Sequence, residues 1–333
     1  MNPAEIKKIF DSFNKLKVLI IGDLMLDVYY WGDVNRISPE APVPIVAISK
    51  KESRMGGAAN VAINIQAMGA TPILCGVIGN DVHGERLIKI LKEKKLPIEG
   101  VIVSTDRPTT TKTRIISNNH HIVRIDDETD EYIGDKQTAK LLKQIEKIIN
   151  AGKADVIIFE DYDKGVMSSE LIKKVVALAQ KKNIPTVVDP KKRNFTDYSG
   201  VTLFKPNLKE LREGLKVDIH AGDLKQVQAI TEKFRKAHKI SNVLVTLSEH
   251  GVFISSDKEK KLVPAHIRNI SDVSGAGDTV VSVAALCCAL NLSPILIAFL
   301  SNLAGGQVCE KTGVVPVDKK QLLEEALHYM NGK

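Results

Sequence analysis

Short apolar runs alternate with helix-like stretches along most of the chain, and this alternation restricts the fold more than any other feature. Lys17–Gly22 (KVLIIG) and Asn242–Thr246 (NVLVT) are typical runs, short and rich in strand-forming residues. Further strands are expected at Ile73–Ile78, Asp155–Phe159 and Pro185–Asp189, and helices at Ala58–Met68, Gly84–Lys94, Lys136–Asn150, Ser169–Lys181 and Asp223–His238. This spacing predicts an α/β fold with a doubly wound, mainly parallel central sheet and helices on both faces. Ligands in such folds bind beyond the carboxyl ends of the strands.

Two stretches interrupt the alternation. Tyr29–Lys50 is rich in β-formers and prolines, and Thr109–Asp126 alternates polar with apolar residues. We predict that they form a small β-sheet standing off the main domain, as a lid or a dimer-forming flap. The alternative is a simple edge extension of the main sheet. With a separate small sheet, ranges 1–28, 51–108 and 127–333 would form the α/β core, and ranges 29–50 and 109–126 would form the flap.

Charge and composition narrow the choice of partner. The net charge of +7 indicates either a solvated basic surface or a preference for anionic small molecules. Aromatic residues make up only 5% of the chain and the basic runs are short, so no nucleic-acid partner is expected. The four cysteines lack CxxC spacing, which favours buried thiols in a reducing cytosol over a metal site or disulfides. The amino terminus has no apolar signal segment, so we expect a cytoplasmic protein.

One uncharged stretch, between Asp278 and Glu310, is long enough to raise the question of a membrane span. Asn291, Ser293 and Pro294 interrupt it. Two buried helices joined at residues 291–294 explain the stretch better than one span, so no membrane association is expected.

A glycine-rich segment, Asp272–Thr279 (DVSGAGDT), precedes the first of these helices. Gly275 and Gly277 allow backbone N–H groups to converge, and the helix dipole adds positive charge there, which suits an anion. Asp278 is either a helix cap or a working base. A second small-residue segment, Gly56–Asn60 (GGAAN), allows close approach of a ligand or another backbone, although a tight turn is the commoner cause.

Several polar residues follow predicted strands. Asp23 and Asp27 come after the first strand, where a carboxylate can accept hydrogen bonds from sugar hydroxyls or act as a turn residue or cap. Asn207 and Glu210 have the spacing of a capping box, or lie near a hydrated Mg²⁺. Thr246–Gly251 (TLSEHG) is a strand end and turn that could edge a nucleotide. Motifs of P-loop proteins, protein kinases, GxSxG hydrolases and HExxH metalloproteases do not occur.

Taken together, these segments resemble the ribokinase-like carbohydrate kinases of the PfkB family, from about Lys17 to Pro316. Gly56–Asn60 looks like the family's amino-terminal glycine motif, and Asp272–Asp278 looks like its carboxy-terminal catalytic motif. Asn207 and Glu210 match its NxxE element. The resemblance implies a ribokinase-like fold, ATP as co-substrate and Mg²⁺, while a monovalent-cation requirement stays open. Three departures are Ser248 where many members have Gly, Ser274 where Thr is common, and His120 where heptose kinases often have Gln.

A narrower resemblance is carried by Arg36–Pro44 (RISPEAPVP), which is similar to the heptose 7-phosphate kinases of lipopolysaccharide core synthesis. Five more segments share it: Gly22–Asp27, Thr111–Arg114, Val123–Asp126, Asp161–Gly165 and Asp189–Lys191. It implies ATP-dependent phosphorylation of the anomeric 1-hydroxyl of D-glycero-beta-D-manno-heptose 7-phosphate to the 1,7-bisphosphate. It also implies a stand-alone kinase, a homodimer formed through the flap, and a separate nucleotidyltransferase acting later. The alternatives are a family kinase for another sugar or sugar phosphate, and a non-catalytic sugar- or nucleotide-binding module.

The same resemblance implies roles for individual residues. Asp278 would accept the proton of the sugar hydroxyl, and the N–H groups of Gly275, Ala276 and Gly277 would stabilise the transferring phosphoryl group. The implied substrate-binding residues are Asp23, Asp27, Gly56, Gly57, Asn60, Arg114, Arg124, Asp161, Lys164, Lys191 and Arg193. The implied nucleotide-binding residues are Asn207, Glu210, Thr246, Gly251, Gly275, Gly277 and Asn302, with Asn207 and Glu210 holding Mg²⁺ through water. The cationic members would bind the substrate's phosphate, and arginines on the flap would couple closure to substrate binding.

Overall fold

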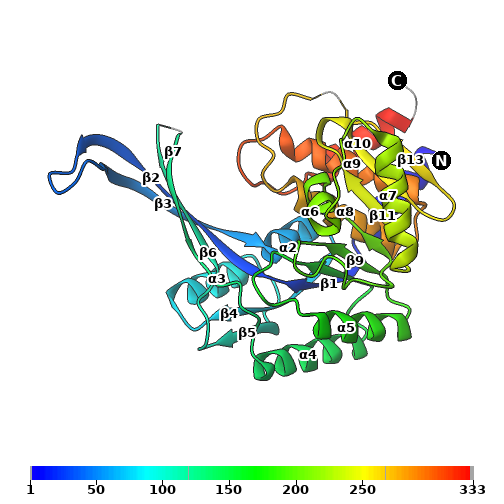
Figure 1. Ribbon diagram of the computed structural model, residues 1–333, viewed down its shortest axis with the longest axis horizontal. Helices are drawn as coiled ribbons and strands as arrows, with labels where there is room; N and C mark the ends of the chain where they lie inside the picture. Colours follow the sequence, from blue (N-terminus) through cyan, green and yellow to red (C-terminus); the bar gives the residue numbers. More distant parts are fainter. Residues whose placement is uncertain (1, 119, 267, 331–333) are drawn as a thin grey trace.

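A large, mainly parallel sheet carries the fold, in the computed structural model that describes residues 2–118, 120–266 and 268–330 (Figure 1). Its strand order is β13-β12-β11-β10-β9-β8-β1-β4-β5. The strands are β1 (Lys17–Gly22), β4 (Thr71–Gly79), β5 (Gly100–Ser104), β8 (Val156–Glu160), β9 (Thr186–Asp189), β10 (Leu203–Phe204), β11 (Asn242–Thr246), β12 (Val252–Ser255) and β13 (Lys260–Val263). Pairings from β5 to β11 are parallel, and β12 and β13 continue the sheet in antiparallel pairings. The predicted doubly wound, mainly parallel sheet is confirmed.

Helices cover both faces of this sheet, because successive strand side chains point to opposite sides. Val18 and Ile20 of β1 join one apolar core, and Leu19 and Ile21 join the other. The first core includes side chains of α1 (Pro3–Phe13), α2 (Ala58–Ala67), α3 (Val82–Glu93), α8 (Ala276–Ala289), α9 (Pro294–Cys309) and α10 (Lys319–Met330). The second includes those of α4 (Asp135–Asn150), α5 (Ser169–Lys181), α6 (Leu208–Leu215) and α7 (Leu224–Ala237).

The uncharged stretch before Glu310 forms two helices, α8 and α9, as predicted. Asn291 has a left-handed backbone with φ of 52°, which turns the chain between them. Ser293 caps α9 by accepting the N–H of Leu296, and Pro294 occupies the first turn. Both helices are largely buried in the first core. Across the described residues, none of the helices has the length and apolarity that crossing a membrane requires.

A separate small sheet stands off the core on one side (Figure 1). It consists of β2 (Leu24–Ile37), β3 (Pro44–Gly57), β6 (Thr111–Ser117) and β7 (His120–Asp127), in the order β3-β2-β6-β7. An edge extension of the main sheet, the alternative from the sequence, is therefore wrong. These strands extend beyond the ranges 29–50 and 109–126, and residues 331–333 of the expected core lie outside the described residues. We call this sheet the lid.

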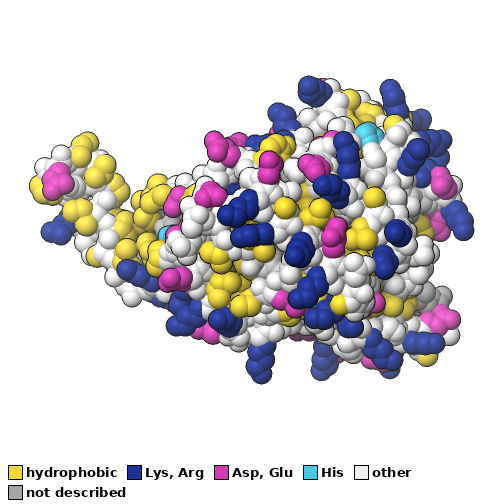
Figure 2. Space-filling view, turned by 90° about the horizontal axis from the view of Figure 1, so that it is seen from below, with side chains coloured by type: hydrophobic (Ala, Val, Ile, Leu, Met, Phe, Trp, Pro, Cys, Tyr) yellow, Lys and Arg dark blue, Asp and Glu magenta, His cyan; other side chains and the backbone are white. Residues whose placement is uncertain are grey.

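The lid is joined directly to the carboxyl ends of the core strands. β1 leads into β2 with only Asp23 between them, and β3 leads straight into α2. The base of the lid therefore meets the edge of the sheet where ligands are expected. Hydrophobic side chains gather on the protruding arm (Figure 2). Exposed apolar residues of the lid and its connecting turn are Ile37, Val43, Ile48, Ile122, Val123 and Ile125.

Candidate active site

Asp278 lies in the first turn of α8, at the carboxyl edge of the large sheet. Gly275 is the cap residue of this helix, with φ of 79°, a left-handed conformation that glycine adopts without strain. The carboxylate faces other elements: Oδ2 accepts a hydrogen bond from Asn60 Nδ2 at 2.6 Å, and Oδ1 accepts one from the Tyr162 hydroxyl at 2.8 Å. Of the two interpretations from the sequence, this geometry favours a working carboxylate over a helix cap.

Burial changes the acidity of Asp278. The side chain is 7% exposed, and burial raises the pKa of its carboxyl to about 6, with the charge of Asp189 adding to the shift. The hydrogen bonds from Asn60 and Tyr162 act in the opposite direction. A carboxylate with this acidity is still ionised at neutral pH and is a stronger base than an exposed aspartate.

The backbone around Gly275 supplies the anion-binding part of the site. N–H groups in the first turn of a helix have no acceptors within that helix, and the helix dipole adds positive charge. The Ala276 N–H is directed to Val273 O at 3.3 Å, a long contact that leaves the turn open to a better acceptor. Asp272 holds the preceding loop by accepting the N–H groups of Ser274 and Gly313, both at 2.9 Å.

A row of ionisable residues forms the floor of the site. Glu160, Asp189 and Lys205 lie at the ends of β8 and β9 and just after β10, on the face that carries α8. Glu160 and Asp189 are direct partners in the register, and Lys205 Nζ lies 2.9 Å from Asp189 Oδ2. A Cβ at Gly277 would lie 3.8 Å from both Asp189 Oδ2 and Lys205 Nζ, so the floor lies directly beneath the glycine turn.

Three carboxylates of this region converge. One oxygen each from Glu160, Asp189 and Asp278 lie within 4.8 Å of one another. Lys205 and Lys191 supply positive charge to this cluster, since Lys191 Nζ lies 3.8 Å from Asp189 Oδ1. Glu160 is fully buried, and its burial, together with the charges of Asp189 and Asp278, raises the pKa of its carboxyl well above the usual value. These surroundings therefore favour the protonated form of Glu160.

The glycine motif at residues 56–60 connects the lid to Asp278. Gly57 caps α2, and Asn60 of that helix reaches Asp278. A Cβ at Gly56 would lie 2.4 Å from Asp27 Oδ2, so glycine is required for Asp27 to pack here. Asp27 in turn pairs with Arg114 of the lid, with Oδ1 2.6 Å from the guanidinium. Close approach, and not only a tight turn, explains this motif.

Asp23 and Asp161 are both occupied by protein donors. Asp23 is 2% exposed, and its carboxylate accepts the backbone N–H groups of Tyr162, Lys164 and Val166 at 2.8 to 3.2 Å. Asp161 accepts hydrogen bonds from Asn194, Tyr198 and the Asp163 backbone. These contacts make both aspartates organisers of the segment that follows β8, and their role as sugar ligands stays a prediction.

Each of the predicted phosphate-binding cations pairs with a carboxylate, and these ion pairs do not form one cluster. Arg114 pairs with Asp27, and Lys164 pairs with Glu128 at 2.6 Å. Arg124, on the lid, pairs with Asp126 at 2.9 Å and its side chain is 58% exposed. The remaining two have these partners: Lys191 contacts Glu210 and lies over the ring of Tyr162, and Arg193 pairs with Asp130.

Apart from Gly275 and Gly277, the predicted nucleotide-binding residues follow β10 or lie near the end of β11, and Asn302 lies on α9. Asn207 and Glu210 form a complete capping box at the start of α6, so the capping alternative is present in the structure. Asn207 also bridges to Thr246 at the end of β11. Asn302 donates to Pro264 O at 2.8 Å. Ser248 adopts φ of 52°, a left-handed conformation that glycine adopts more easily than serine.

A family profile described as "pfkB family carbohydrate kinase" matches residues 15–320. The chain belongs to the PfkB family. Among curated proteins it is similar to the bifunctional protein HldE of Sulfurimonas denitrificans, with 39% identity over 96% of this chain and 66% of that protein. The HldE of Magnetococcus marinus is 37% identical over 93% of this chain and 64% of its own length. The chain thus spans about two thirds of the curated relatives that it matches.

Solved structures show the same fold. Phosphofructokinase-2 from Escherichia coli superposes with a TM-score of 0.76, 17% identity, and coverage of 95% of this chain and 99% of that one. Ribokinase from Arabidopsis thaliana superposes with a TM-score of 0.72, 16% identity, and coverage of 93% and 99%. With the family match, the ribokinase-like fold is confirmed, and the chain is an ATP-dependent carbohydrate kinase.

Sequence reasoning missed three residues of this PfkB-family site: Glu160, Tyr162 and Lys205. Each follows or ends a buried strand, which is the signal that could have found them. Strand ends alone did not show that Glu160 and Lys205 share one face with Asp189. The direction of the Tyr162 side chain depends on how the segment after β8 turns around Asp23.

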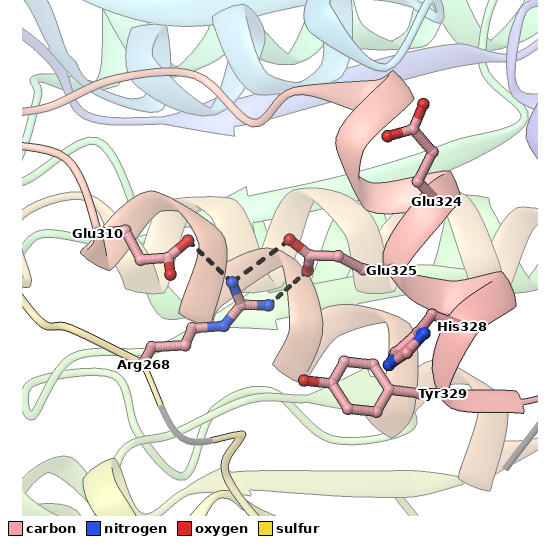
Figure 3. Close-up of a pocket in the computed structure, with 6 residues that line it drawn as sticks. All are labelled: Arg268, Glu310, Glu324, Glu325, His328 and Tyr329. Atoms are coloured by element: carbon pink, nitrogen blue, oxygen red, sulfur yellow. Dashed lines mark hydrogen bonds and ion pairs between the residues drawn. The ribbon is translucent and has the colours of Figure 1, made fainter. Parts of the chain in front are cut away.

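Two cavities lie outside this site in the PfkB-family kinase. One, of about 380 Å³, is lined by Arg268, Glu310, Glu324, Glu325, His328 and Tyr329 (Figure 3). There Arg268 points between Glu310 and Glu325 and pairs with both, which ties the segment before Asp272 to α9 and α10. The other, of about 290 Å³, includes Arg107, which donates to the carbonyl of Lys164. Among the described residues, the linings of both cavities include none of the predicted site residues.

Proposed function

We propose that this kinase transfers the γ-phosphoryl group of ATP to the anomeric 1-hydroxyl of D-glycero-beta-D-manno-heptose 7-phosphate. The observation that carries the proposal is convergence. Three of the segments that resemble the heptose 7-phosphate kinases, at residues 22–27, 161–165 and 189–191, lie far apart in the sequence yet meet near Asp278, whereas residues 36–44 form the far end of the lid (Figure 1). Tyr162 donates to Asp278, Lys191 lies over the Tyr162 ring, and Asp23 holds the Tyr162 backbone. Asp27 and Arg114 adjoin this group through Gly56.

The proposed reaction uses Asp278 as the base. Asp278 takes the proton of the anomeric hydroxyl as its oxygen bonds to the γ-phosphorus, and the bond from that phosphorus to the bridging oxygen of ADP breaks. An anomeric hydroxyl is more acidic than an ordinary alcohol, so a carboxylate is an adequate base. The N–H groups of Gly275, Ala276 and Gly277 would stabilise the negative charge on the transferred group. Asn60 would orient Asp278 and meet a sugar hydroxyl.

A substrate that already carries a phosphate needs cations at a distance from the base. Arg114 and Lys164 supply them in the proposed complex, where the phosphate would compete with Asp27 and Glu128 for these side chains. Arg124 would join them when the lid closes over the sugar. Because Lys191 lies against Asp189 and Glu210, we assign it to the transferred phosphoryl group instead.

Mg²⁺ is the metal that the family implies, and Asn207 and Glu210 fit an indirect role. The oxygens of both side chains are engaged in the capping box, and Glu210 also contacts Lys191. These residues would therefore hold the ion through water, as suits a cation that keeps much of its hydration shell. When bound, Mg²⁺ neutralises charge on the ATP phosphates.

We also propose that two copies of the chain associate through the lid. The support is the row of exposed apolar side chains on the lid, of which Ile37 is 60% and Ile125 is 53% exposed. Sedimentation velocity should give a dimer for the wild type and a shift towards monomer for Ile125→Lys. A wild-type protein that stays monomeric at all micromolar concentrations would refute this assignment.

The substrate is tested by measuring ADP release against a panel of sugars: heptose 7-phosphate, unphosphorylated heptose, fructose 6-phosphate and ribose. We expect kcat/KM for heptose 7-phosphate to exceed that for each other sugar by at least roughly a hundredfold, the selectivity of a site built for one polar group. Preference for another sugar would favour a different kinase of the family. If none of the sugars gives ADP release, a non-catalytic module is favoured. Asp278→Asn, purified identically, controls for contaminating kinases.

A further inference from the structure

Tyr162 makes a direct contact with the proposed base that the reaction described above does not use. Its hydroxyl donates to Asp278 Oδ1 at 2.8 Å, while Asn60 donates to Oδ2 at 2.6 Å. One donor on each oxygen fixes the rotation of the carboxylate plane, which a single donor would leave free. The lone pairs that these two donors do not use are left to accept the proton of an incoming hydroxyl.

The segment that carries Tyr162 is wrapped around a second carboxylate. Asp23 Oδ2 accepts the N–H groups of Tyr162 at 2.8 Å and Lys164 at 3.1 Å, and Oδ1 accepts that of Val166 at 3.2 Å. Asp163, inside this turn, has φ of 56°. Three hydrogen bonds to one buried acceptor fix the backbone that sets the direction of the phenol. Lys191 packs over the ring, with Nζ 5.0 Å from its centroid.

We propose that Tyr162 is a positioning residue, which holds the Asp278 carboxylate in the direction of proton transfer, and that Asp23 acts on catalysis by fixing the Tyr162 segment. The inference rests on the proposed role of Asp278 as base. It gives Asp23 an indirect function in addition to the sugar contact expected from the sequence. It also predicts that the two residues act in series, Asp23 through Tyr162 and Tyr162 through Asp278.

The chain offers a matched control for this proposal. Tyr198 is also a buried phenol that donates to a buried aspartate, Asp161, and that hydrogen bond is 2.8 Å long as well. Asp161 is occupied by protein donors and makes no contact with Asp278 among the hydrogen bonds of the described residues. Tyr162→Phe and Tyr198→Phe therefore remove the same group from similar surroundings, and only the first removes it from the base.

The experiment compares the pH dependence of kcat and kcat/KM for both variants, using ATP and the sugar that the panel selects. For Tyr162→Phe we expect kcat at pH 7 to fall by roughly tenfold to a hundredfold, the range for losing a hydrogen bond to an ion. The KM for ATP should stay within about twofold, because the Tyr162 hydroxyl donates to Asp278 and, among the described residues, to no predicted nucleotide-binding residue. The hydrogen bond from Tyr162 favours the ionised form of Asp278, so its loss should raise the pKa of this carboxyl and move the acid limb of kcat/KM to higher pH. Tyr198→Phe should leave the acid limb unchanged and lower kcat less than Tyr162→Phe does, because its hydroxyl reaches Asp161 and not the base.

A second variant, Asp23→Asn, tests the series arrangement, and its effect in the wild-type background stays informative if Tyr162→Phe is poorly folded. Asp23→Asn should lower kcat in the wild-type background and have little further effect in the Tyr162→Phe background, since both act through one contact. Additive losses, an unmoved acid limb in Tyr162→Phe, or equal losses in Tyr198→Phe would each overturn the proposal. If Asp278→Asn retains turnover, the assignment of Asp278 as the base is wrong, and this result does not depend on the Tyr162 variants.

Discussion

Replacing the buried Asp278 with asparagine should stabilise the folded protein while it abolishes turnover. The carboxyl group has a pKa of about 6 in the folded chain against 3.8 in an unfolded one. Below pH 3.8 the group is protonated in both states and burial carries little electrostatic cost. As the pH rises towards 6 the unfolded chain ionises first, so the folded state loses stability over this window.

The size of the effect follows from the shift. A difference of about two pKa units corresponds to roughly 3 kcal/mol in the free energy of unfolding, reached above pH 6 and mostly absent at pH 4. Asparagine keeps the shape and carries no charge at any pH. The free energy of unfolding of Asp278→Asn should therefore exceed that of the wild type by an amount that grows from pH 4 to pH 8. Turnover should fall by roughly a hundredfold to ten-thousandfold, as for loss of a general base.

Urea denaturation at pH 4, 5, 6 and 8, without nucleotide or metal, measures the first quantity, and ADP release measures the second. Asp81→Asn is the control of opposite sign. Asp81 caps α3, and although burial opposes the shift, hydrogen bonds from the Thr109 and Gly84 backbones lower the pKa of its carboxyl. That variant should be less stable than the wild type, with a deficit that develops as the pH rises through 3.8 and is nearly complete by about pH 5. A stability difference for Asp278→Asn that stays constant from pH 4 to pH 8 would refute the reasoning from burial.

Three further predictions use the same assays. Arg124→Ala should raise KM for a phosphorylated sugar far more than for an unphosphorylated one, and equal effects would argue against a phosphate contact by this exposed side chain. Glu160→Gln should reduce the loss of stability that wild type shows as the pH rises above 4.5, because the folded-state pKa of Glu160 is raised; an unchanged slope in urea titrations would contradict this. The wild-type kcat/KM should fall about tenfold per pH unit below about pH 6, where Asp278 is protonated, and a flat profile there would count against it as base.

The sequence was informative where local chemistry decides the outcome. The glycines of DVSGAGD predicted a turn into a helix, and Gly275 is the left-handed cap residue there. Asn207 and Glu210 predicted a capping box, which forms completely. The interrupted uncharged stretch predicted two buried helices, and Pro294 begins the second. Each of these depends on backbone conformation or hydrogen bonding within a few residues.

The floor of the site could not be predicted in this way. Glu160, Asp189 and Lys205 are brought together by the parallel register of three strands and by the side-chain alternation that turns all three towards α8. The contact of Tyr162 with Asp278 joins residues 116 positions apart and depends on the turn around Asp23. Pairings of this kind depend on the assembled sheet, because no local pattern encodes which strands become neighbours.

By itself, then, the sequence determined the alternating α/β pattern, the glycine turns and the presence of an aspartate at the start of α8. Only the tertiary structure decided what that aspartate is. Packing of α2, α8 and the β8 end encloses Asp278, sets Asn60 and Tyr162 on its two oxygens, and raises its pKa to about 6. The physical reason is that acidity depends on the surrounding dielectric and charges, which come into existence only when distant segments pack together.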